Sequence, residues 1–120
     1  SNQERTDEWM KLNKEYGTGL TDWNGYEEIL ETSWQRQLHI FEVPFYYIEY
    51  GIAQLGALGV WKNSLTDKTQ AIQDYKNALK LAYTKTIPEI YSTANIDFNF
   101  EKEHINKLAV FVNEQLKNLK

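Results

Sequence analysis

The sequence predicts an all-α protein of about five or six helices packed around one central helix that is rich in tyrosine and glycine. Two observations indicate this fold class. Apolar residues recur with the 3.6-residue helical period along several separate segments. The one stretch with strand-like alternation, NIDFNF at residues 95–100, has no second strand to pair with, so we expect an extended connector there.

Composition limits the class of protein further. The 120 residues are 42% hydrophobic and 25% charged, as in ordinary globular chains, and we place them in one helical domain, residues 1–120. A net charge of −4, without a dense cluster of lysine or arginine, makes nucleic acid and membrane surfaces poor partners. The absence of cysteine excludes disulfides and thiolate metal ligands. No signal peptide or membrane span is visible, so we expect a cytoplasmic protein.

The first 44 residues predict two helices. Apolar side chains at helical spacing predict a helix over residues 5–16, which a glycine-containing loop at residues 17–19 ends. A turn at residues 22–25 leads into a second helix over residues 26–38. We expect residues 39–44 to break the helical pattern, so that His39 faces the helix that follows.

The central helix is predicted over residues 45–62. Pro44 lies just before it, where a proline favours a helix start. Its core positions are expected to be Phe45, Ile48, Ile52 and Leu55. Three glycines in this segment leave a smooth surface on which another backbone can lie close.

Three further helices are predicted after a loop at residues 63–68. Thr66 or Asp67 caps the first of them, whose apolar face we expect to point inward. A short helix starts at Pro88 and covers residues 88–93. The last helix covers residues 101–119, with Asn99 as a possible cap and an apolar stripe that includes Leu108 and Leu116. The inward face after the loop is Ala71, Ile72, Tyr75, Ala78, Leu79 and Ala82.

Four hydrogen-bonding side chains gather near the start of the central helix: His39, Tyr46, Tyr47 and Tyr50. Helical spacings of three and four place Tyr50 on one face with the other two tyrosines. One interpretation is a buried helix with anchored phenols. The other is a cleft for water or a ligand, because a buried phenol needs a hydrogen-bond partner.

Catalytic and metal-binding motifs within the chain are weak. His39 with Glu42, and Glu101 with His104, are acid–histidine pairs at helical spacing, but a metal site needs more ligands than either supplies. We therefore predict no metal bound by these residues, and a solvated His104. There is no cysteine nucleophile, no glycine-flanked serine and no phosphate-binding glycine loop.

Residues 39–61, HIFEVPFYYIEYGIAQLGALGVW, closely resemble the C-terminal segment of oligoendopeptidase F-like proteins, which are zinc peptidases of the thimet-oligopeptidase family. The segments WNGYEEILETSWQRQ, AIQDYKNALKLA and IPEIYSTANIDFNF resemble the same family, so that the resemblance covers roughly residues 9 to 117. The family's zinc motif, His-Glu-x-x-His, is absent from the sequence.

The resemblance implies that this chain is the C-terminal part of a larger helical peptidase fold that hydrolyses short peptides. His39, Tyr47 and Tyr50 match the positions that contact the substrate and the oxyanion of the transition state, and Tyr46 is assigned to substrate binding. The zinc ligands would lie outside this chain, in the missing N-terminal catalytic portion, so the chain alone is expected to be inactive. The alternative is a stand-alone helical module that binds a peptide or a partner helix without catalysis.

The extent of uncovered apolar surface distinguishes these two readings. A fragment of a larger fold should expose an apolar face where the missing portion packs, and it is a possible homo-oligomer through that face. An independent module should hide its apolar side chains.

Overall fold

A computed structural model of the chain describes residues 1–119, in which all regular structure is helical. It contains seven α-helices and one short 3₁₀-helix, and no strand occurs among the described residues. The all-α prediction is therefore confirmed, although the helices are more numerous and several are shorter than predicted. By their contacts the residues form two compact units, residues 1–47 and a second unit that begins at Ile48. A single domain over the whole chain stays a prediction.

Helix α1 (Asn2–Tyr16) opens the first unit and begins three residues earlier than predicted. The reason is a capping box, in which the backbone N–H of Glu4 donates to the Ser1 hydroxyl at 3.3 Å. The helix ends at Gly17, as the sequence indicates. A Cβ atom there would lie 2.2 Å from the carbonyl oxygen of Asn13, so no larger residue fits this position without a shift of the backbone.

The predicted helix over residues 26–38 is wrong in its form. The segment divides into α2 (Glu27–Thr32) and the 3₁₀-helix η1 (Ser33–Arg36), and α3 (Leu38–Glu42) then occupies most of the expected break. Gln37 interrupts the helical path, since its backbone angles of −87° and 81° lie outside the helical region. The Ser33 hydroxyl donates to the Leu30 carbonyl at 2.7 Å, a local bond that competes with regular helix formation.

Trp34 is the buried centre of the first unit, with 5% of its surface exposed. Its indole N–H donates to the Thr6 hydroxyl of α1 at 3.2 Å. Its ring lies 5.9 Å from that of Phe41 in α3, and the Arg5 guanidinium lies 5.8 Å above it. Trp34 therefore connects α1, η1 and α3, and it holds the helix that carries His39.

A turn, rather than a helix start, follows Pro44. The backbone N–H of Tyr46 donates to the Val43 carbonyl at 3.1 Å, and Phe45 has a φ of +66°. Pro44 at the second position and a positive φ at the third are the pattern of a type II turn, which costs a non-glycine residue about 1–2 kcal/mol. The next helix therefore begins at Ile48 instead of residue 45. Phe45 is 95% exposed, so its prediction as a core residue is wrong.

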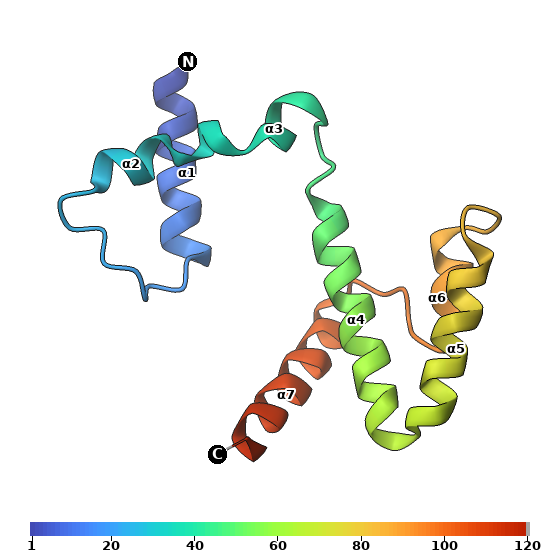
Figure 1. Cartoon of the computed structure of the whole chain (residues 1–120). Coiled ribbons are helices and arrows are strands. Elements are labelled where there is room, and N and C mark those ends of the chain that lie inside the picture. The colour runs from blue at the N-terminus through green and yellow to red at the C-terminus, as the bar shows by residue number, and fades with distance from the viewer. Residues whose placement is uncertain (120) are drawn as a thin grey trace. The chain divides into compact units, whose positions relative to one another are not determined.

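The second unit consists of α4 (Ile48–Thr66), α5 (Lys68–Leu81), α6 (Ile87–Thr93) and α7 (Lys102–Asn118). In this unit α4 contacts both α5 and α7, and α6 packs beside α5 (Figure 1). Helix α4 continues through most of the expected loop at residues 63–68. Asp67, not Thr66, caps α5, because its carboxylate accepts a hydrogen bond of 3.0 Å from the Gln70 N–H.

The predicted extended connector between α6 and α7 is confirmed. Pro88 lies in the first turn of α6, as expected, and no strand forms at residues 95–100. Phe98 packs with its ring centre 5.2 Å from Tyr91 and 4.8 Å from Phe100, which fixes the connector to its own unit. The Asn99 side chain accepts from the backbone N–H of Glu101 at 2.8 Å, although Glu101 itself is the residue that precedes the helix.

The second unit leaves many apolar side chains uncovered. On α5, Ala71 and Ala78 are buried as predicted, whereas Tyr75 and Leu79 from the same face are exposed. On α7, Leu108 is buried but Leu116 is exposed, as is Leu119 just after this helix, and on α4 Ile48 is exposed against expectation. The predicted apolar positions are thus real, but the four helices of this unit cover only part of them. Exposed apolar area of this kind marks a surface that packs against something else.

Candidate functional site

The structure brings together three of the four predicted site residues, all in the first unit. His39 is half-buried in α3, and its ring stacks on Tyr46 with ring centres 6.3 Å apart and planes 5° from parallel. Tyr47 meets the same imidazole edge-on, at 5.4 Å and 83°. We call His39, Tyr46 and Tyr47 the aromatic cluster.

The turn at residues 43–46 creates the aromatic cluster. It reverses the chain directly after α3, so that the two tyrosines come back against the histidine. The prediction that Tyr46 and Tyr47 lie on a helix with Tyr50 is therefore wrong, because α4 begins only at Ile48. Proximity comes from the proline turn instead of from helical spacing.

Gln37 is a further member of this site that the sequence did not reveal. The Tyr47 hydroxyl donates a hydrogen bond of 3.1 Å to the Gln37 side-chain oxygen. About half of each tyrosine surface is exposed, 51% for Tyr46 and 52% for Tyr47, so both rings remain accessible to a bound molecule. The cluster therefore presents an imidazole and two phenols at an accessible surface, with one phenol oriented by an amide.

Tyr50 belongs to the second unit, where it lies in the first turn of α4 and is 55% exposed. Spacings of three and seven residues place it on one face of the helix with Ala53 and Ala57. The backbone just beyond it is fixed by Tyr91 of α6, whose hydroxyl donates to the Ile52 carbonyl at 2.7 Å. Tyr91 is thus a supporting residue that the sequence did not single out.

The environment of Tyr91 favours the protonated form of its phenol. Burial raises the pKa of its phenol, and the nearby Glu49 carboxylate raises it further, while a hydrogen bond with the Gly56 backbone opposes the change. A neutral phenol remains a hydrogen-bond donor at neutral pH. Its contact with the α4 backbone requires Gly56, because a Cβ atom there would lie 2.7 Å from the Tyr91 oxygen and 3.0 Å from the adjoining ring carbon.

Alanine substitutions at Gly51 and Gly56 should therefore have opposite effects. A Cβ at Gly51 meets nothing within 4 Å, so Gly51→Ala should stabilise the helix by about 0.5–1 kcal/mol. Gly56→Ala crowds Tyr91 and should cost about 1–3 kcal/mol. Hydrogen exchange of the α4 amides measures both changes. The double variant Gly56→Ala/Tyr91→Phe removes the crowded oxygen and should regain part of the stability that Gly56→Ala loses. Equal exchange protection in the Gly51→Ala and Gly56→Ala variants would contradict this account.

The described residues do not form a metal site. No group of three or more histidine, cysteine, aspartate or glutamate side chains among residues 1–119 fits a metal ion. His104 is not solvated as predicted, because its side chain is only 19% exposed and its Nδ1 atom lies 3.9 Å from an Asp97 carboxylate oxygen. This pair connects α7 with the connector that precedes it.

Within residues 1–119, no helix has the length and apolar character that a membrane span requires.

Comparisons with protein-family models, with curated proteins and with solved structures find no match to this chain. The resemblance to oligoendopeptidase F-like peptidases therefore stays a prediction from residues 39–61 and the segments around them.

Proposed function

We propose that the chain is the C-terminal part of an oligoendopeptidase F-like zinc peptidase that hydrolyses short peptides. In this proposal His39, Tyr47 and Tyr50 contact the substrate carbonyl and the oxyanion, and Tyr46 binds the substrate. The observation that carries the proposal is the aromatic cluster, since the motif that resembles the family folds into a compact and accessible set of donors.

The chemistry of these donors suits peptide hydrolysis. An imidazole N–H and a phenol O–H can each point at the charge that develops on a carbonyl oxygen during attack, and they need not be charged to do so. In the unbound chain the Tyr47 hydroxyl donates its proton to the Gln37 side-chain oxygen at 3.1 Å. To donate to a carbonyl oxygen of the substrate, this hydroxyl has to exchange that bond for one to the bound peptide. Loss of one such donor in other enzymes costs about 2.7–4 kcal/mol of transition-state stabilisation.

The uncovered apolar surface also supports a larger fold. Between Ile48 and Trp61 the only charged residue of α4 is Glu49, yet Ile48 and Tyr50 at the start of this helix are exposed. A helix that is apolar on all sides is typical of the interior of a large protein. We therefore place α4 at the centre of a larger helical peptidase fold, which the remainder of the protein would complete.

The residues that the structure describes offer no zinc site, so the proposal assigns no zinc ligand to them. The described histidine and acidic side chains do not converge on a common point. In this proposal the ligands belong to the N-terminal catalytic portion, and the chain's own residues bind and orient the peptide. A cytoplasmic location and self-association through the exposed apolar face stay predictions.

The natural reading frame upstream of Ser1 tests the proposal directly. We expect several hundred further codons that include a His-Glu-x-x-His motif, and we expect the pure 120-residue chain to show no zinc-dependent hydrolysis of short peptides. A reading frame that starts within a few codons of Ser1 would overturn the proposal in favour of a helical peptide- or partner-binding module. Zinc-dependent hydrolysis by the isolated chain would overturn the assignment of the ligands to another portion.

A further inference from the structure

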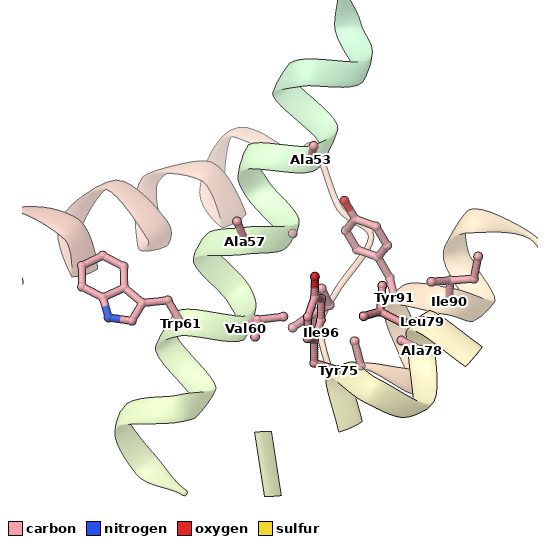
Figure 2. Close-up of a pocket in the computed structure, with 12 residues that line it drawn as sticks. Ala53, Ala57, Val60, Trp61, Tyr75, Ala78, Leu79, Ile90, Tyr91 and Ile96 are labelled. Atoms are coloured by element: carbon pink, nitrogen blue, oxygen red, sulfur yellow. The ribbon is translucent and has the colours of Figure 1, made fainter. Parts of the chain in front are cut away.

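The second unit contains an apolar groove between α4, α5 and α6, with a volume of about 440 Å³. Figure 2 shows Ala53 and Ala57 on α4, with Tyr75 and Leu79 of α5 and Tyr91 of α6 across from that helix. None of the lining side chains is charged. The polar side-chain atoms of the lining are the two tyrosine hydroxyls and the indole nitrogen of Trp61, and the Tyr91 hydroxyl already donates to the Ile52 carbonyl. We call this space the α4 groove.

The α4 groove is continuous with the helix face that carries Tyr50. Tyr50, Ala53 and Ala57 follow one another at spacings of three and four residues, so they lie along one side of α4. A rise of about 1.5 Å per residue puts Ala53 about 4.5 Å and Ala57 about 10.5 Å beyond Tyr50 along the axis. In an extended peptide, side chains on the same face are separated by about 6.6–6.8 Å.

We propose that the α4 groove is the subsite for a large uncharged side chain of the bound peptide, two residues away from the residue that contacts Tyr50. This inference rests on the proposed function and adds a substrate preference to it. A peptide that runs along α4 from Tyr50 reaches the level between Ala53 and Ala57 with its next side chain on that face. The small alanine side chains leave room for it, and Gly56 brings the Tyr91 ring close enough to form a wall.

The lining selects phenylalanine, leucine or a similar side chain. A lysine or aspartate in the α4 groove would lose its water without gaining a counter-charge, because no lining residue supplies one. Burial of a large apolar side chain corresponds to about 10- to 100-fold in binding. The volume of the groove accommodates such a side chain together with part of the peptide backbone.

Blocked pentapeptides Ala-Ala-X-Ala-Ala, with X as Phe, Leu, Ala, Lys or Asp, test the preference on the 120-residue chain by calorimetry and NMR. We expect the Phe and Leu peptides to bind about 10- to 100-fold more tightly than the Lys and Asp peptides. The Trp61 indole resonance should shift on binding, because Trp61 lines the groove and packs against Phe111 with ring centres 4.9 Å apart.

Two variants locate the effect. Ala53→Leu/Ala57→Leu fills the α4 groove at exposed positions and should abolish the preference without unfolding the unit. Gln73→Leu adds a similar apolar side chain at an exposed position of α5 outside the groove, and it should leave the preference unchanged. Retention of the preference in the filled variant would overturn the assignment of the subsite.

The failure of this inference can be distinguished from the failure of the proposed function. Equal affinity for all five peptides, or no binding of any, would overturn the subsite. It would leave the proposed function standing, since backbone contacts by the aromatic cluster do not depend on X. Conversely, an upstream reading frame without a zinc motif would overturn the proposed peptidase function. A preference for apolar side chains that is measured on the chain would then be a property of a peptide-binding module.

Discussion

Tyr50→Phe and His39→Ala should each lower kcat/KM for a short peptide by about 100- to 1000-fold in the protein that includes the zinc-binding portion. The reason is the loss of a hydrogen-bond donor to the oxyanion, an interaction that matters most in the transition state. The fall should therefore appear in kcat, with KM nearly unchanged for Tyr50→Phe. Steady-state kinetics with an internally quenched peptide measure both constants.

The matched control is Tyr83→Phe, since Tyr83 is fully exposed at the end of α5 and takes no part in the proposed site. It should retain the activity of the parent protein. Tyr46→Phe provides a second comparison, because a residue that binds the substrate in the ground and transition states alike should raise KM and leave kcat nearly unchanged. Full activity of both Tyr50→Phe and His39→Ala would contradict the roles proposed for these two side chains.

Three helices of the second unit, α5, α6 and α7, were predictable from local chemistry. The period of apolar residues located α5 and α7, Asp67 supplied a cap, and Pro88 marked the first turn of α6. In the first unit the apolar period continues through residues 26–38, and the single helix that it predicts there is wrong. The chain leaves the helical path at Gln37, next to a Trp34 side chain that contacts Phe41 and also Thr6, which lies 28 positions away in the sequence.

The composition of the site was predictable, but its geometry was not. His39 and the neighbouring tyrosines attract attention by residue type alone. Their actual contact depends on a positive φ at Phe45, a conformation that a phenylalanine does not indicate in a sequence. Tyr91 is equally hidden, because its hydroxyl meets the carbonyl of Ile52 across 39 positions of the chain.

Periodicity also cannot tell whether an apolar face is covered. Leu108 and Leu116 both follow the apolar stripe of α7, yet one is buried and the other exposed. The difference depends on which neighbours lie opposite each position, and these neighbours belong to other elements of the chain. The exposure of apolar residues in the structure therefore indicates missing neighbours, whereas the apolar period in the sequence does not.

Trp34→Ala should destabilise the first unit by about 3–5 kcal/mol, the usual cost of removing a buried tryptophan. The substitution empties the centre of a unit in which Trp34 is the one large side chain that is nearly fully buried among residues 1–47. It also removes the contact with Phe41 that holds α3 in place. Because small units have little stability to lose, we expect the near-ultraviolet circular dichroism and the exchange protection of α1 to disappear.

Trp34→Phe separates packing from hydrogen bonding in this unit. It retains most of the buried ring but loses the bond to the Thr6 hydroxyl, so it should cost about 1 kcal/mol and keep α1 protected. The two variants should also differ in their effect on the aromatic cluster, because α3 carries both Phe41, which contacts Trp34, and His39. In Trp34→Ala the ring-current shifts that stacking on Tyr46 gives the His39 resonances should vanish, whereas in Trp34→Phe they should persist. If His39 keeps those shifts in Trp34→Ala, then the turn at residues 43–46 holds the cluster without support from Trp34.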